Sequence, residues 1–255
     1  MLTIQAIHVS PVKSLGLSNP TSVRVSPTGI EEDRRFYLID ADGKLLTQRQ
    51  IGKLVQAKAD YDRHRDFLSI GLPDGTSVEG KCELEEDSVA TRIFGSTAQG
   101  NVLQGDWSDA LSAFCGQQVR LVKTVEPGMC YDEYPVSLLS EASVQHLSGQ
   151  SGASVSFDSR RFRPNFLVDG CEPHEEDQWV GNMIRIGDEL RLRVIARDPR
   201  CAITTHDPAT GETDSDTLRL ILSYRPSNQA AFFGVFGTVE RPGTVSVGDE
   251  VVLTV

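Results

Sequence analysis

The sequence contains no long hydrophobic run and few cysteines. None of its apolar stretches approaches the roughly 18 residues of a membrane-spanning helix. Its five cysteines are scattered and form no C-x-x-C pair. This spacing argues against a structural zinc site or a disulfide framework and favours a reducing compartment. The N-terminus lacks a basic segment followed by an apolar one. We therefore expect a cytoplasmic protein that makes no membrane contact.

Common catalytic and nucleotide-binding signatures are also missing. The chain has no G-x-G-x-x-G after a strand, no G-K-[ST] phosphate loop, no G-x-S-x-G elbow and no H-E-x-x-H. Its five histidines are isolated, which argues against a histidine-rich zinc site. A net charge of −11 over 255 residues argues against general binding to nucleic acid or anionic membranes.

Short segments of period two, separated by turns, dominate the chain. We expect strands over residues 2–9, 23–25, 36–39, 45–48, 54–60, 66–71, 76–80, 89–94, 119–122 and 166–168, and hairpins around residues 187–188 and 248–249. Helices are expected over residues 106–115 with Asp106 as cap, over 140–149 with Ser140 as cap, and over 217–224. Residues 148–156 are rich in Ser and Gly, which indicates a loop. This pattern predicts a mainly β protein with β-barrel architecture and a boundary near residue 120.

One cysteine lies in a context that suggests chemistry. Cys201 follows a predicted strand and a proline-containing turn, within the stretch 198–214. A loop held by a sheet often presents reactive groups, so a thiolate here could be a nucleophile, a redox thiol or a metal ligand. A small buried hydrophobic residue is an equally good interpretation. His206 could pair with the cysteine, although the turn around it favours a surface histidine.

Basic residues gather in three short stretches, although the whole chain is acidic. They are Lys13, Arg34, Arg35, Arg160, Arg161 and Arg163, and each stretch lies near the end of a predicted strand. Arginine forks and a lysine ammonium suit phosphate. If the stretches converge, they could bind an anionic cofactor. On composition alone, pairing with surface carboxylates is favoured.

Seven short strings in order carry a family resemblance. They are PVKSL at 11–15, DRRF at 33–36, LSEAS at 139–143, RFRPNFLV at 161–168, RCAITTHDPATG at 200–211, SYR at 223–225 and RPGTVSVGDEV at 241–251. Together they resemble the MOSC family, and in particular its two-part members related to the mitochondrial amidoxime reducing component. The resemblance implies an N-terminal MOSC β-barrel domain over residues 1–120 and a β-barrel MOSC domain over 121–255.

The resemblance also implies a molybdenum cofactor, Mo-molybdopterin, with Cys201 as a sulfur ligand to the metal. A soft thiolate is chemically suited to that role. The positions matched to cofactor binding are Lys13, Ser14, Arg34, Arg35, Arg163, Asn165, Arg200, Thr204 and Thr205. Thr204 and Thr205 could equally be ordinary strand residues. Asp207 is the expected proton-delivering carboxylate, with a capping role in the turn before Pro208 as an equal alternative.

The reaction implied is a two-electron reduction of a small N-hydroxylated compound, with oxygen removal at molybdenum. No cysteine follows Cys201, so no iron–sulfur cluster is expected in this chain. Electrons are expected from an external electron-transfer protein and its reductase, and pyridoxal phosphate is not expected. One alternative is a non-catalytic carrier of molybdenum cofactor or of sulfur on Cys201. Another is a reductase that acts on S- or N-oxides at the same site.

Overall fold

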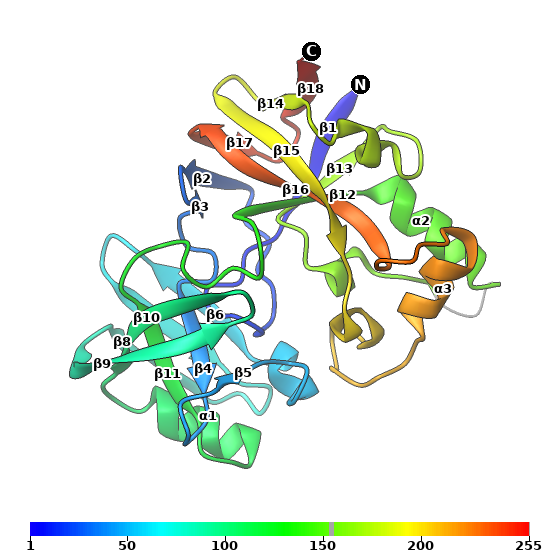
Figure 1. The fold of residues 1–255 in the computed structure, drawn as a ribbon. Helices are drawn as coiled ribbons and strands as arrows, with labels where there is room; N and C mark the ends of the chain where they lie inside the picture. Colours follow the sequence, from blue (N-terminus) through cyan, green and yellow to red (C-terminus); the bar gives the residue numbers. More distant parts are fainter. Residues whose placement is uncertain (153–155, 255) are drawn as a thin grey trace.

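The computed structural model describes residues 1–152 and 156–254. Strands dominate, with a few short helices, which confirms the predicted mainly β fold class. Figure 1 shows two parts: a barrel carrying both chain termini, and a second part built from the strands and the helix between residues 36 and 124. We call these the barrel part and the N-terminal part.

The barrel part is a closed barrel of seven strands. In order around the barrel they are β1 (Leu2–Ile7), β13 (Phe166–Asp169), β12 (Val136–Ser140), β16 (Phe232–Arg241), β15 (Leu190–Pro199), β14 (Met183–Ile186) and β18 (Glu250–Thr254). β12 and β13 run parallel, whereas β1 pairs antiparallel with both β13 and β18. The first strand of the chain therefore closes a barrel whose other strands come from its C-terminal half. The chain boundary near residue 120 stays a prediction.

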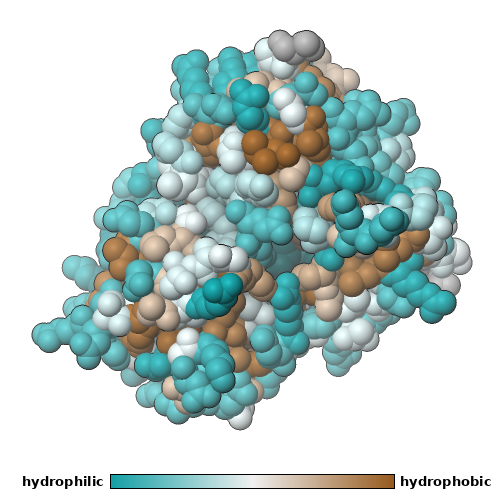
Figure 2. Space-filling view, viewed as in Figure 1, coloured by the Kyte–Doolittle hydropathy of each residue, from teal (hydrophilic) through white to brown (hydrophobic). Residues whose placement is uncertain are grey.

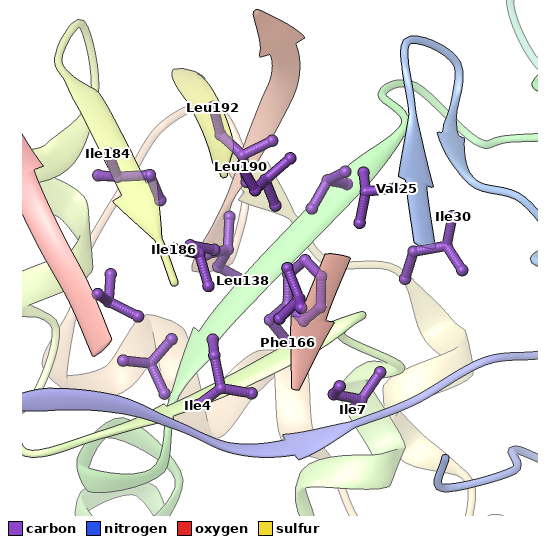
Figure 3. Packing of buried hydrophobic residues seen from close by; sticks show 14 of the residues in the cluster. Ile4, Ile7, Val25, Ile30, Leu138, Phe166, Ile184, Ile186, Leu190 and Leu192 are labelled. Carbon is purple, nitrogen blue, oxygen red and sulfur yellow. The ribbon is translucent and has the colours of Figure 1, made fainter. Parts of the chain in front are cut away.

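The interior of the barrel is filled by aliphatic residues that alternate along the strands. Ile184 and Ile186 on β14, and Leu190 and Leu192 on β15, are fully buried, as the period-two pattern predicts. Figure 3 shows them converging with Phe166 and residues from β1, from β12 and from the paired strands β2 (Ser22–Ser26) and β3 (Gly29–Ile30). This close-packed core holds the strand ends, and the loops beyond them, in fixed positions.

Two helices cover one side of the barrel, α2 (Glu141–Gln150) and α3 (Thr217–Tyr224). Their apolar residues pack with Phe233 and Leu139 of the barrel strands. The Ser140 side chain accepts a hydrogen bond from the Ser143 N–H, so the predicted cap of α2 is confirmed. The barrel part also contains short 3₁₀ helices: η2 (Ser159–Phe162), η3 (Glu175–Trp179) and η4 (Ala202–Thr205).

The N-terminal part consists of two sheets and a helix. The larger sheet has the order β5 (Leu45–Leu46), β4 (Phe36–Ile39), β11 (Arg120–Thr124), β10 (Ser96–Leu103) and β9 (Leu84–Ile93). The smaller one consists of β6 (Lys58–Asp62), β7 (Phe67–Gly71) and β8 (Ser77–Lys81), with η1 (Gly52–Gln56) before it. Phe36, Leu68 and Leu121 share one core with Trp107 and Leu111 of α1 (Trp107–Cys115). A third small sheet, β17 (Gly243–Ser246), β2 (Ser22–Ser26) and β3 (Gly29–Ile30), adjoins the barrel.

Several sequence-based expectations about local structure are wrong. The second expected hairpin does not form, because β17 pairs with β2 while β18 pairs with β1 and β14. The expected strand over 54–60 begins only at Lys58, since η1 occupies the preceding residues. Asp106 makes no side-chain capping bond to α1, although the helix ends where expected, at Gly116 in the left-handed conformation. In the expected loop over 148–156, α2 continues to Gln150, and residues 153–155 lie outside the described residues.

The surface is mainly hydrophilic on the face shown in Figure 2, with small hydrophobic areas between the polar ones. No helix within residues 1–152 and 156–254 is long and apolar enough to cross a membrane.

Candidate functional site

A cavity of about 970 Å³ lies between the two parts of the molecule. Its wall combines Lys13, Gln48 and Phe94 from the first hundred residues with Cys201 and Phe236 from the barrel part. Its size is within the range of cofactor and ligand pockets. We call it the main cavity. It contains the largest group of the side chains that the sequence analysis singled out.

Cationic side chains predominate among the charged residues of the main cavity. Six line it: Lys13, Arg34, Arg49, Arg161, Arg163 and Arg200. Three acidic residues line it as well: Asp132, Glu133 and Asp198. This local excess of positive charge contrasts with the net charge of −11 of the whole chain. The three basic stretches of the sequence therefore do converge, which suits an anionic ligand.

The buried carboxylate of Asp33 organises one wall of the main cavity. One oxygen accepts the Ser10 N–H at 2.7 Å, and the other accepts the Asn165 side-chain amide at 3.0 Å and a guanidinium N–H of Arg34. Asn165 in turn accepts the Ser137 N–H at 3.0 Å. One carboxylate thus ties the loop before Lys13, the Arg34 turn and strand β12 together.

Three non-glycine residues of this wall have left-handed backbone conformations. They are Ser14 with φ 75°, Arg34 with φ 50° and Arg163 with φ 50°. Such conformations are costly for residues with a Cβ, and they concentrate at functional sites. Arg163 donates hydrogen bonds to the Ser10 hydroxyl at 2.9 Å and to the Leu15 carbonyl at 2.8 Å. These bonds tie Arg163 to the segment around Ser14 at the cavity wall.

The pKa values of the two arginines of this wall shift in opposite directions. Burial lowers the pKa of Arg163 to about 10, with a further lowering from the nearby charge of Arg34. Burial also acts to lower the pKa of Arg34, but the carboxylates of Asp33 and Asp132 outweigh it and the net direction is upward. Both side chains are therefore cations at neutral pH. Lys13 completes the group, with its ammonium 2.6 Å from Asp132 and 2.9 Å from the Cys130 carbonyl.

Cys201 is presented on a tight turn on the barrel side of the main cavity. It precedes η4, and its carbonyl accepts the Thr204 N–H at 3.1 Å and the Thr204 hydroxyl at 3.0 Å. Thr217 of α3 donates to the Thr204 carbonyl at 2.7 Å. The thiol is half-buried and free of any disulfide. The Thr204 hydroxyl thus shapes the turn that carries the thiol.

Asp198 and Arg200 form a buried pair beside Cys201 and line the main cavity. Arg200 donates to the Phe233 and Phe162 carbonyls at 2.6 and 2.8 Å. Its remaining nitrogen, Nη2, is buried and has no hydrogen-bond partner among the described residues. Burial raises the pKa of Asp198 to about 7, against the opposing effect of Arg200. The site therefore contains an unused donor and a carboxyl group that titrates near neutrality.

Four of the predicted site residues do not line the main cavity. Arg35 is engaged with the carbonyls of Thr124 and Val125. Asn165 lies buried behind the wall. The Thr205 hydroxyl donates to the Ala202 carbonyl at 2.6 Å. Asp207 accepts the N–H groups of Ala209 and Thr210, which is the turn-capping role weighed as its alternative.

The sequence analysis missed several residues that line the main cavity. Arg161 is not one of them, because it belongs to the basic set that could converge on an anionic cofactor; it lines the cavity while paired with Asp214. Asp198 is separated from Cys201 by only two residues, and this closeness in sequence could have identified it as a site residue. Aromatic rings from distant segments also line it: Phe94, Tyr131, Tyr134, Phe162 and Phe236. The Tyr134 and Phe236 rings lie 5.5 Å apart, which gives the cavity an apolar side suited to an organic molecule.

No group of three or more His, Cys, Asp or Glu side chains within the described residues could hold a metal ion by itself. A metal at Cys201 would therefore take its other ligands from a bound cofactor. The residues present fit such a group, because a soft thiolate and an unpartnered Arg200 nitrogen share a cavity lined by cations.

Comparison with known families covers almost the whole chain. The family described as the MOSC domain matches residues 116–252, and the family described as the MOSC N-terminal beta barrel domain matches residues 1–118. Among curated proteins, mitochondrial amidoxime-reducing component 1 of Mus musculus is 29% identical over 98% of this chain and 82% of its own length. Mitochondrial amidoxime reducing component 2 of Bos taurus is 28% identical with the same coverage.

Two further similarities are more distant. The molybdenum cofactor sulfurase of Caenorhabditis elegans is 26% identical over 92% of this chain, which corresponds to 33% of that protein. Among solved structures, the YUAD protein from Bacillus subtilis aligns over 99% of this chain and 96% of its own, with a TM-score of 0.47 and 13% sequence identity.

Proposed function

The chain belongs to the MOSC family, and from this membership and the main cavity we propose that it binds a molybdenum cofactor at Cys201 and reduces N-hydroxylated compounds. The observation that carries the proposal is the placement of Cys201 in a cavity lined by six cationic side chains. The similarity to amidoxime-reducing components over nearly the full chain supports the substrate class.

In this proposal the basic wall holds the anionic part of the cofactor. Arg34 is fixed there by Asp33, Arg163 by Ser10, and Lys13 by Asp132 and the Cys130 carbonyl, so their charged groups need little further ordering when the ligand binds. Arg200 supplies an additional donor through its unpartnered Nη2. Ser14, which follows Lys13 and has a left-handed backbone conformation, is a further cofactor-binding residue of this wall. Cys201 supplies the thiolate ligand, and the bound group supplies the two-electron redox chemistry of oxygen removal.

Asp198 replaces Asp207 as the proton-holding residue in this proposal. Reduction of an N–O bond to an amine and water consumes protons, so a carboxyl group that is protonated near neutral pH is useful next to the reacting centre. Asp198 lines the main cavity and has a pKa raised by burial, whereas the pKa of Asp207 is lowered: burial alone would raise it, but the N–H groups of Thr210 and Ala209 outweigh that effect. Asp198 therefore satisfies both the position and the protonation that the role requires.

The proposed substrate is a small organic molecule that lies on the aromatic side of the main cavity, near Tyr134 and Phe236. The proposed electron source is a separate electron-transfer protein with its reductase, because the sequence carries no dinucleotide-binding signature. Docking of such a partner is expected to weaken as salt concentration rises, since the chain is strongly charged.

Turnover with an artificial donor tests this function. Purified protein from a molybdenum-supplied host should reduce an amidoxime or a hydroxylamine when reduced viologen is the electron donor, and should not do so with a reduced nicotinamide alone. An S-oxide assayed in parallel identifies the alternative substrate class. Metal-free protein that carries a persulfide on Cys201 would instead support a sulfur carrier, the function suggested by the similarity to a molybdenum cofactor sulfurase.

A further inference from the structure

A second cavity of about 470 Å³ lies beside the main cavity. The two meet at Gln48, Arg161 and Arg163, which line both. The outer walls of the second cavity come from Lys58 and its neighbours on one side and from Arg160 and the 206–210 turn on the other. None of the roles proposed above uses this space.

The charged residues that line the second cavity are cationic. They are Lys58, Arg160, Arg161 and Arg163, and no acidic residue of the described chain lines it. Arg160 and Arg161 are paired with Asp158 and Asp214 outside the lining. Among the described residues, no carboxylate lies within ion-pairing distance of Lys58 or Arg163. Lys58 is therefore free to pair with a ligand of the second cavity, and Arg163, which also lines the main cavity, adds its positive charge where the two cavities meet.

Three polar atoms around the second cavity are buried without a partner in the described part of the chain. They are Gln48 Oε1, Arg161 Nε and His206 Nδ1. Gln48 and Arg161 are 3% and 4% exposed, and burying such groups without a hydrogen bond is costly. An anionic group with a hydroxyl or amide beside it would satisfy both the free charges and these unpaired atoms.

Two hydrogen bonds to backbone carbonyls fix residues that line the second cavity. The Gly16 N–H donates to the Ala57 carbonyl at 2.8 Å, which places the Lys58 side chain across Gly16. On the opposite side, the Gln56 side chain donates to the Thr210 carbonyl at 2.7 Å. A preformed site of this kind needs little ordering when a ligand binds.

We propose that the second cavity is a binding site for a phosphate or carboxylate group. The group is either the anionic end of a substrate whose reacting end lies in the main cavity, or a free phosphate ester that binds on its own. The choice between these two sources rests on the proposed reductase function, whereas the binding site itself does not. The Lys58 ammonium and the Arg163 guanidinium supply the charge, and Arg161 Nε supplies a directed hydrogen bond.

Titration of the purified protein with inorganic phosphate, followed by calorimetry, tests the site without any need for activity. Saturable binding is expected in the wild type, and Lys58→Glu should weaken it about tenfold or more, because an attractive charge becomes a repulsive one. Lys81→Glu is the matched control, since Lys81 is an exposed lysine of the same three-stranded sheet and does not line the cavity. Absence of phosphate binding, or equal loss in both variants, overturns the proposal.

Steady-state kinetics then distinguishes the two sources. If the site takes the end of a substrate, phosphate competes with a carboxylate-bearing N-hydroxylated substrate, and Lys58→Glu raises the KM of that substrate but leaves the KM of its neutral ester unchanged. If it takes a free phosphate ester, phosphate alters turnover of both substrates without competing with either. A protein that binds phosphate through Lys58 but reduces no N-hydroxylated compound supports the site while contradicting the proposed reductase function.

Discussion

An oxygen of the Asp198 carboxylate lies 2.8 Å from a guanidinium nitrogen of Arg200, and both side chains are buried within three positions of Cys201 in the sequence. This pair places an ionisable group at the wall of the main cavity. Because burial raises the pKa of Asp198 to about 7, the carboxyl group is protonated below that pH and loses its proton as the pH rises through it.

The first prediction concerns the pH dependence of turnover. If Asp198 supplies a proton, kcat/KM for an N-hydroxylated substrate should fall as the pH rises through about 7. Asp198→Asn should lower the rate and remove this limb of the profile. Asp207→Asn is the control and should keep it, since Asp207 caps a turn outside the main cavity. An unchanged limb in Asp198→Asn would show that another group carries the proton.

The second prediction concerns the Asp33 network. Asp33→Ala removes the acceptor for the Ser10 N–H and the Asn165 amide and leaves the buried Arg34 charge without its partner. We expect the free energy of unfolding in urea to fall by about 3–5 kcal/mol. Asp109→Ala, an exposed site in the first turn of α1, should change it little. Equal stability of the two variants would mean that the network does not hold the cavity wall.

The third prediction concerns the seam between the two parts. A Cβ added to Gly211 would lie 2.0 Å from the Gly52 carbonyl oxygen, whereas one added to Gly43 would meet nothing within 4 Å. The two glycines have nearly the same φ, 78° and 79°, so the substitutions share one conformational cost of about 1–2 kcal/mol. Thermal unfolding should therefore show a clearly larger loss for Gly211→Ala than for Gly43→Ala. Equal losses of thermal stability in the two variants would indicate that the backbone around Gly211 and Gly52 can move apart at no cost in stability.

The fourth prediction concerns the basic wall. Lys13→Ala or Arg163→Ala removes a charged donor from the main cavity and should weaken cofactor binding by about tenfold or more. Molybdenum and pterin content of the purified variants measures this effect. Arg193→Ala, which removes an exposed pair with Glu240, should retain full content. Full occupancy in both cavity variants would contradict the role of this wall.

Local pattern predicted the elements whose partners lie nearby in sequence. The β14–β15 hairpin, the Ser140 cap and the Gly116 end of α1 are set by a few neighbouring residues. β12 was missed because every one of its positions is buried and it pairs in parallel with β13, so it shows no alternation. The second expected hairpin failed because a period of two specifies a strand but not its partner.

Several residues of the candidate site could be predicted because they belong to the strings shared with the family, but the strings do not show which of their residues line the cavity. Lys13, Arg34, Arg163 and Cys201 were all identified from these strings, and all four line the main cavity. Neighbouring residues within the same strings, such as Arg35, face other contacts. Their direction depends on backbone conformations such as the left-handed φ of Arg34, which the packed structure imposes and no local pattern reveals.

The most direct test of the account is the molybdenum stoichiometry of the purified protein, combined with X-ray absorption at the metal, in the wild type and in Cys201→Ser. We predict about one molybdenum per chain in the wild type and one fewer sulfur ligand in the variant, with activity lost and the fold retained, because a hydroxyl is a harder and poorer ligand than a thiolate. Cys115→Ser, a change at a half-buried cysteine of α1, should match the wild type. Wild-type protein without molybdenum from a molybdenum-supplied host, or an unchanged sulfur count in Cys201→Ser, would contradict the central claim.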